Sequence, residues 1–133
     1  MNKFLAFISF FLFLSCGWFE NDGISFEEKI VGKFVIIQDR SDTNKNFNLA
    51  FKNSDGVSSI YSGIADNCKK VIYDSISKKI YVQENDDNPN FKEIIIIDLK
   101  TDNFVKSKKI KNITKEKFES TLSNCENCII KNY

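Results

Sequence analysis

Apolar and polar residues alternate with a period of two through most of the chain, which is the pattern of strands with one buried face. Phe47, Leu49 and Phe51, for example, are separated by single polar or small residues. The alternation predicts strands over residues 33–38, 47–52, 57–65, 69–74, 79–84, 91–99 and 104–110. Turn-forming residues lie between these segments, as in Asn53-Ser54-Asp55-Gly56.

Side chains two positions apart share a face of a strand. The pairs expected to lie together are Phe34 with Ile36, Val35 with Ile37, Val71 with Tyr73, and Ile80 with Val82. The run Ile94-Ile95-Ile96-Ile97 is apolar on both faces, so it predicts the central strand, covered on both sides.

Two segments carry helical signals instead. Thr114 can cap a helix over residues 115–123, and Ile113 and Phe118 have the spacing of a hydrophobic staple. Ser25 and Glu28 have the spacing of a capping box, which predicts a helical turn over residues 26–30. Together the elements predict a mainly β (α+β) fold: a single antiparallel sheet domain that curls into a sandwich or barrel, with one short C-terminal helix.

The beginning of the chain has a different pattern. Lys3 precedes an apolar run over residues 4–14, and Ser15 and Cys16 follow it. A positive charge, an apolar core of about 7–15 residues and a small residue at the cleavage site are typical of a secretory signal. The run is shorter than the stretch of about 20 apolar residues that spans a membrane as a helix.

The segment Phe13-Leu14-Ser15-Cys16 resembles the lipobox of bacterial lipoproteins. The resemblance implies that signal peptidase II cuts before Cys16 and that acyl chains such as palmitate anchor this cysteine in a membrane. Because Gly17 rather than Asp follows, it also implies delivery to the outer membrane. The expected organisation is a lipoprotein signal peptide over residues 1–15, a lipidated tether over 16–24 and a β-rich domain over 25–133. An ordinary signal peptide with a chance cysteine is the alternative.

Charge and composition exclude several classes of function. Cleavage before Cys16 removes Lys3 from the 19 basic residues, so 18 basic residues (19 − 1) face 18 acidic ones. A balanced surface gives no reason to expect a nucleic-acid partner. The chain has no histidine, which excludes Ser-His-Asp and Cys-His nucleophiles and histidine-ligated zinc. We expect no catalytic residues, no metal site and no cofactor.

The expected domain contains Cys68, Cys125 and Cys128, and disulfides persist in the envelope. Pairing Cys68 with either of the others would close a loop of roughly 60 residues, worth on the order of 4 kcal/mol. We therefore expect Cys68 to join Cys125 or Cys128, with a Cys125–Cys128 bridge as the next choice. The Cys-x-x-Cys spacing also occurs in thiol redox enzymes, where it opens a helix, whereas here it follows one.

The clearest charge asymmetry is a lysine-rich segment near the C-terminus. Lys106, Lys108, Lys109 and Lys111 form a candidate anion-contact patch that could face lipid head groups or an acidic partner. Because Lys106 and Lys108 alternate with Ser107, we favour the solvated face of an edge strand, where lysines prevent the addition of further strands.

Two classes of function fit these observations. The first is an envelope lipoprotein, anchored in the membrane by its lipid, that acts as a binding or structural module for a protein or glycan of unknown identity. An immunity or inhibitor protein against an envelope-active toxin or hydrolase is one form of it. The second, a thiol- or carboxylate-based enzyme, has less support. The body, with segments such as Val71-Ile72-Tyr73-Asp74 and Lys79-Ile80-Tyr81-Val82, resembles small β-rich bacterial lipoproteins, a resemblance that implies no particular activity.

Overall fold

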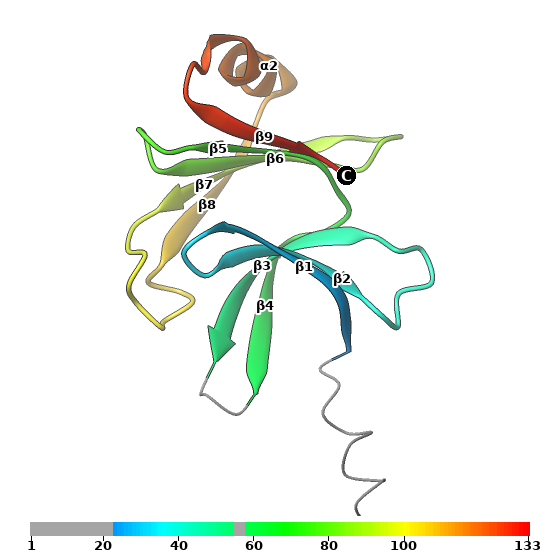
Figure 1. The fold of residues 1–133 in the computed structure, drawn as a ribbon. Helices are drawn as coiled ribbons and strands as arrows, with labels where there is room; N and C mark the ends of the chain where they lie inside the picture. Colours follow the sequence, from blue (N-terminus) through cyan, green and yellow to red (C-terminus); the bar gives the residue numbers. More distant parts are fainter. Residues whose placement is uncertain (1–22, 55–57) are drawn as a thin grey trace, which may run out of the picture.

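The computed structural model describes residues 23–54 and 58–133, which form two antiparallel sheets packed face to face (Figure 1). The first sheet contains, in sequence order, β1 (Ile24–Val31), β2 (Phe34–Asp39), β3 (Phe47–Ser54) and β4 (Ser59–Ala65). The second contains β5 (Cys68–Asp74), β6 (Lys79–Glu84), β7 (Asn90–Ile96), β8 (Lys108–Ile113) and β9 (Cys128–Asn132), in the spatial order β8-β7-β6-β5-β9. The helix α2 (Lys115–Asn124) connects β8 to β9. The mainly β fold with one C-terminal helix is therefore confirmed, as a sandwich rather than a closed barrel.

The main core lies between the two sheets and is built by the period-two alternation of their strands. The first sheet contributes Phe34, Ile36, Leu49 and Phe51, and the second contributes Val71, Ile80, Val82, Ile94 and Ile96. Val35 and Ile37 lie on the other face of β2, in a smaller cluster with Ala50. The expected face assignments of β2, β3, β5 and β6 are confirmed, because burying one set of alternate side chains fixes the register of each strand.

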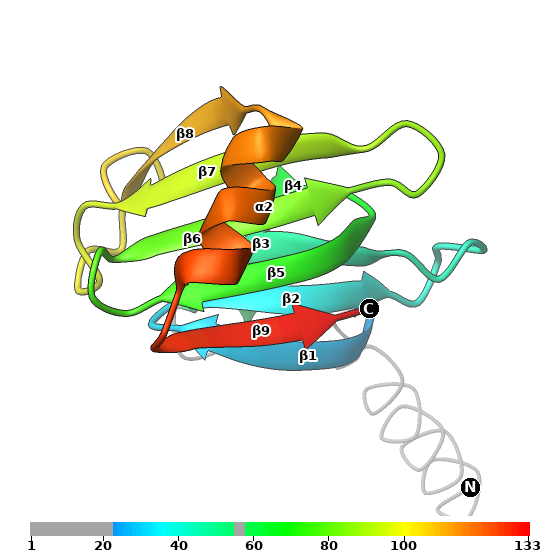
Figure 2. The ribbon, with the colours of Figure 1, turned by 90° about the horizontal axis from the view of Figure 1, so that it is seen from above.

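The helix α2 lies across the outer face of the second sheet (Figure 2). Its N-cap is Thr114, whose hydroxyl oxygen accepts a hydrogen bond from the Lys117 N–H at 3.2 Å, as expected. Phe118 is fully buried against Ile72, Tyr81 and Phe91, in a second apolar cluster. The helix therefore covers the middle of the sheet with one aromatic anchor.

The structure corrects the expected helical turn over residues 26–30. These residues belong to β1, in which Glu28 pairs with Ile36 of β2. The capping-box spacing is a local signal, whereas the β1–β2 hairpin satisfies the backbone groups of the whole segment.

Two other expectations are wrong at the second sheet. The isoleucine run belongs to β7, which lies between β6 and β8 rather than at the centre, and Ile97 is 64% exposed beyond the end of the strand. Residues 104–107 form a turn before β8 instead of beginning the strand. The C-terminal strand β9, which the alternation did not indicate, pairs with β5 and completes the sheet.

The loops gather at two opposite ends of the sandwich (Figure 2). The β1–β2 turn, the β5–β6 turn and the long connection between β7 and β8 lie at one end. The start of β1, the β2–β3 loop and the β4–β5 link lie at the other, where the Arg40 N–H donates to Gly23 O at 2.7 Å.

Candidate functional site

The structure joins Cys125 to Cys128, so the prediction that Cys68 pairs with one of them is wrong. Cys68 begins β5, faces the main core and is only 1% exposed. Cys128 pairs with Asp74 at the other end of β5 and contacts the cluster beneath α2 on the opposite face. The distance along β5 from residue 68 to residue 74 is about 20 Å, whereas bridged cysteines have Cα atoms within about 7 Å.

The three cysteines therefore have different chemistry. Burial raises the pKa of the Cys68 thiol to about 12, so this thiol stays protonated and unreactive. The Cys125–Cys128 disulfide, with Cα atoms 5.6 Å apart, ties the end of α2 to the start of β9. Cys16, the predicted lipid-bearing residue, lies outside the described residues.

The candidate anion-contact patch is divided by the fold. Lys106 is exposed in the turn before β8, and Lys109 and Lys111 are exposed on the outer face of the second sheet. Lys108 is only 8% exposed, and its Nζ donates to Phe104 O at 2.7 Å and lies 3.1 Å from the centroid of the Phe104 ring. The pairing of Lys108 with the core residue Ile96 turns its side chain inward, so its expected place on a solvated face is wrong.

Beside Lys109 and Lys111, β7 carries a buried carboxylate, that of Glu93, which is 1% exposed. One of its oxygens, Oε2, lies 2.9 Å from Lys117 Nζ of α2 and 3.7 Å from Lys79 Nζ of β6. Burial alone would raise the pKa of the Glu93 carboxyl, but these two ammonium groups hold it below its usual value. The sequence signal for this site is that Glu93 shares the alternate positions of β7 with Phe91 and Ile95, so a carboxylate stands on a face that is otherwise apolar.

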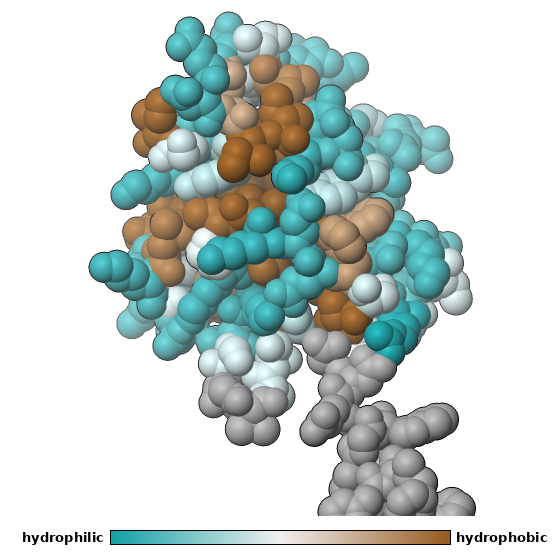
Figure 3. All heavy atoms as spheres, in the orientation of Figure 1, coloured by the Kyte–Doolittle hydropathy of each residue, from teal (hydrophilic) through white to brown (hydrophobic). Residues whose placement is uncertain are grey.

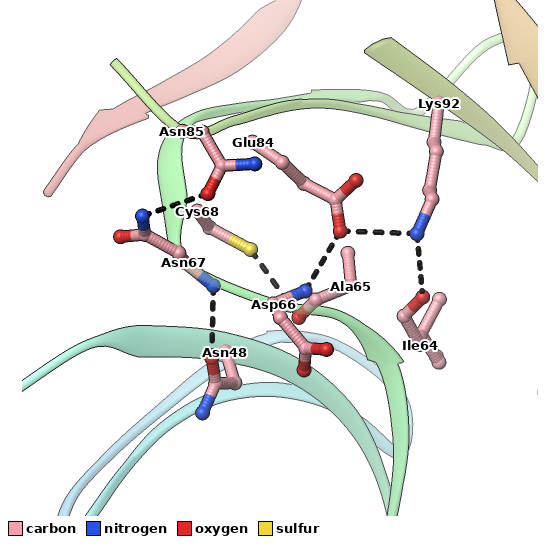
Figure 4. A network of polar contacts seen from close by, with 9 residues as sticks. All are labelled: Asn48, Ile64, Ala65, Asp66, Asn67, Cys68, Glu84, Asn85 and Lys92. Atoms are coloured by element: carbon pink, nitrogen blue, oxygen red, sulfur yellow. Dashed lines mark hydrogen bonds and ion pairs between the residues drawn. The ribbon is translucent and has the colours of Figure 1, made fainter. Parts of the chain in front are cut away.

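A network of polar contacts joins the two sheets where β4 passes into β5 (Figure 4). Glu84 Oε1 accepts a hydrogen bond from the Asp66 N–H at 2.8 Å and lies 3.0 Å from Lys92 Nζ. The Asn67 N–H donates to Asn48 Oδ1 of β3, and the Asn67 amide nitrogen donates to Asn85 Oδ1, each at 2.9 Å. The network supplies hydrogen-bond partners to the backbone N–H groups of the β4–β5 corner, where strand pairing cannot supply them.

A cleft of about 540 Å³ opens beside the Glu84–Lys92 pair, between the β6–β7 loop, β8 and the start of α2. Its walls are Glu84, Pro89, Asn90, Phe91, Lys92, Asn112, Ile113 and Lys115. Amide and ammonium groups converge there, a combination that suits a small polar ligand. No group of cysteine and acidic side chains spaced to hold a metal ion lines this cleft among the described residues.

Large apolar side chains are exposed at the end of the sandwich formed by the β5–β6 turn and the β7–β8 connection. These are Ile76 (75% exposed), Ile97 (64%), Leu99 (36%) and Val105 (77%), which we call the loop end. The Ile96 N–H donates to Lys78 O at 3.0 Å, and the Ile97 N–H donates to Ser107 O at 2.8 Å, so these segments lie side by side. Figure 3 shows separate apolar areas along this margin of the molecule, with hydrophilic surface around them.

The loop end is held to both sheets. Leu99 packs over Gly32 in the β1–β2 turn, where a Cβ would lie 2.9 Å from Leu99 Cδ2 and where φ is +54°. Asp102 forms an ion pair with Lys33, and its carbonyl accepts a hydrogen bond from Asn53 Nδ2 at 2.8 Å. The β7–β8 connection, which carries Ile97, Leu99 and Val105, is therefore held against the first sheet.

No protein-family model matches the chain, and no curated protein or solved structure is significantly similar to it. Among residues 23–54 and 58–133, no helix has the length and apolar character needed to cross a membrane. The function must therefore be inferred from the chain's own residues and geometry.

Proposed function

We propose that this chain is a lipoprotein held in the bacterial cell envelope by acyl chains on Cys16, with a β-sandwich that binds another envelope protein. The anchor is inferred from the leader and from Phe13-Leu14-Ser15-Cys16. The observation that carries the binding role is the loop end, where Ile76, Ile97 and Val105 each expose well over half of their surface. They stand on neighbouring segments at one end of the sandwich, and exposed apolar groups rimmed by polar residues mark interaction surfaces.

The charges around the loop end indicate the chemistry of the partner. Three lysines, Lys78, Lys100 and Lys106, and two acidic residues, Asp98 and Asp102, are exposed beside its apolar residues, and Asp102 is already paired with Lys33. A complementary partner would present an apolar patch bordered by carboxylates, because apolar contact supplies affinity while opposite charges at the rim guide association. The loop end also lies opposite Ile24, where the tether enters the domain, so it would face away from the anchoring membrane.

An immunity or inhibitor protein is one form of this proposal. Its support is that the apolar residues stand on turns and a loop rather than on a flat sheet face. Projecting segments can enter the cleft of a toxin or hydrolase, whereas a flat face cannot.

A second candidate is a glycan ligand in the cleft beside Glu84 and Lys92. Its support is the two amide side chains, Asn90 and Asn112, that line the cleft beside the Glu84–Lys92 ion pair. Amide groups both donate and accept hydrogen bonds, so they suit the hydroxyl groups of a sugar.

The anchor is tested by replacing Cys16 with alanine in cells fed labelled palmitate. We expect the wild-type chain to be labelled and to partition into detergent, and Cys16→Ala to lose both properties. Cys68→Ala is the matched control, because its thiol is buried in the core and it should remain labelled. Labelling of Cys16→Ala at the wild-type level would refute the lipid anchor.

The binding surface is tested by placing a photo-crosslinking amino acid at Val105 or Ile76 in cells of the source bacterium. We expect a discrete adduct with one envelope protein from both positions, and its loss when Ile97→Asp is added. The control is Thr43, an exposed residue in the β2–β3 loop at the opposite end. Equal adducts from Thr43, or none from the loop end, would contradict the proposal.

A further inference from the structure

Three side chains of the kinds that bind metals meet where β5 lies beside β9. Asp74, Cys125 and Cys128 each offer a ligand atom, and these atoms all lie within 4.8 Å of one another. Asp74 and Cys128 are direct cross-strand partners, and the Cα atoms of the cysteines are 5.6 Å apart. The third ligand comes from a strand more than fifty residues earlier, so the Cys-x-x-Cys spacing alone could not reveal it.

The Asp74 carboxylate is already held in position. Its Oδ1 accepts hydrogen bonds from the backbone N–H groups of Ile76 (3.0 Å) and Ser77 (3.3 Å), and its Oδ2 accepts one from Ser77 Oγ (2.7 Å). A carboxylate has about four acceptor positions, so one remains for a cation.

The site is also open enough to exchange a ligand. A cavity of about 230 Å³ is lined by Asp74, Ile76, Asn124, Cys125, Glu126 and Asn127. Both cysteines are half-buried, in contrast to the buried Cys68. A small thiol reductant can therefore reach the disulfide from solvent.

The surroundings argue against a self-activated redox pair. The helix α2 ends at Asn124, next to Cys125, so the negative end of its dipole lies near the sulfurs. Redox-active cysteines lie at the positive end, where the thiolate is favoured. Here a thiolate needs positive charge from another source, which a bound cation would provide.

We propose that the dithiol form of this site binds a zinc-type divalent cation through Cys125 Sγ, Cys128 Sγ and a carboxylate oxygen of Asp74. In the reduction step a dithiol reductant gives two electrons and two protons to the disulfide and itself becomes a disulfide. The cation then displaces the two thiol protons. Three protein ligands leave a fourth tetrahedral position open to water or an added ligand. In the reverse step another disulfide accepts two electrons from the thiolates and two protons from water and becomes a dithiol, while the Cys125–Cys128 bond re-forms and the cation is released. Occupancy therefore follows the local redox state.

The test uses the full chain in detergent, reduced with a phosphine that is then removed without oxygen, and Co²⁺ as the probe. We expect one Co²⁺ per chain, with thiolate-to-cobalt charge-transfer absorption and the visible bands of tetrahedral coordination, and displacement of Co²⁺ by Zn²⁺. The oxidised chain should bind none. Cys125→Ser and Cys128→Ser should each abolish the charge-transfer pattern of two thiolates.

Asp74→Asn separates a metal ligand from a turn-capping residue, because the asparagine Oδ1 can still accept the two backbone hydrogen bonds and its Nδ2 can donate to Ser77 Oγ. We expect this substitution to weaken Co²⁺ binding by about tenfold or more, because loss of the interactions that support a metal site typically lowers metal affinity by at least this factor. Asp39→Asn is the matched control, since Asp39 also accepts bonds from a serine N–H and hydroxyl two residues later, and it should bind normally. Cys68→Ser should also bind normally. Unchanged affinity in Asp74→Asn, loss of the thiolate bands in Cys68→Ser, or no thiolate bands in the reduced wild type would each overturn the proposal.

Discussion

Glu93 shows how much one side chain can determine in this fold. It occupies a position on the outer face of β7 where the helix excludes water, yet it is charged. Lys117 on α2 and Lys79 on β6 approach the same carboxylate oxygen, Oε2. Removing one partner of a buried ion pair leaves the remaining charge without compensation. Breaking the pair therefore costs more free energy of unfolding than the intact pair contributes to stability.

We predict that Glu93→Gln lowers the free energy of unfolding by about 1–3 kcal/mol at pH 7, because both lysines lose their counter-charge. The pKa of Glu93 is lowered in the folded state, so its contribution is present above the ordinary glutamate pKa of about 4.3 and is lost as the pH falls through the lower folded value. Urea unfolding of both proteins at pH 7 and at pH 3 measures this. The difference between wild type and variant should shrink at the lower pH, and a difference that stays constant would contradict the assignment.

At the scale of elements, α2 is attached to the sheet mainly through one residue. Phe118 is the buried residue of the helix, and its ring centroid lies 5.0 Å from that of Phe91. The disulfide fixes the end of the helix, whereas Phe118 fixes its middle.

We predict that Phe118→Ala costs about 3–5 kcal/mol of unfolding free energy, the usual range for a buried phenylalanine. The control is Ser120→Ala on the exposed side of the same helix, which should stay within about 0.5 kcal/mol of wild type. Urea unfolding gives both values, and hydrogen exchange should show faster exchange of α2 amides in Phe118→Ala. Protection of α2 equal to that of the wild type would mean that other contacts hold the helix.

The sequence predicted those elements whose local pattern agrees with their tertiary neighbours. Phe47, Leu49 and Phe51 alternate in the sequence and face the core in the structure, and Thr114 caps the helix that its position indicates. The prediction failed where a long-range pairing overrides the local signal. Ser25 and Glu28 could begin a helix, but pairing with β2 makes the segment a strand.

The candidate sites were harder to predict, because they depend on which faces and ends of strands meet. Cys68 and Cys128 both lie in or beside β5, and only the register shows that they occupy its opposite ends. The sequence predicted Lys108 to be a surface residue, whereas its pairing with Ile96 turns its side chain toward the core. Asp74 joins Cys128 only through the β5–β9 pairing, and β9 itself was not predicted.

At the scale of the whole molecule, the two sheets are joined through the polar network at the β4–β5 corner. Glu84, 6% exposed, stabilises both the Asp66 N–H of the corner and the ammonium group of Lys92 on β7. Its loss would leave a partly buried donor and a partly buried charge without this partner.

We predict that Glu84→Ala lowers the free energy of unfolding by about 2–4 kcal/mol. Glu119→Ala is the matched control, because it removes the exposed Lys115–Glu119 pair and should cost less than about 1 kcal/mol. Chemical unfolding followed by tyrosine fluorescence and by circular dichroism measures both. An equal cost in the two variants would show that burial of the Glu84–Lys92 pair is energetically unimportant.

The contact between the two ends of the domain bears on how quickly it folds. Tyr133 donates its hydroxyl hydrogen bond to Glu28 Oε1 at 2.9 Å across a separation of 105 residues, and Lys131 lies 3.6 Å from the same carboxylate oxygen. Contacts between segments so distant along the chain have a high contact order. The entropy of closing the loop between the two ends must be lost before these contacts form. We expect the last folding phase to be the docking of β9 beside β5 and β1. In pulse-labelling hydrogen exchange, the amides of β9 should then acquire protection after those of the β5–β6 hairpin.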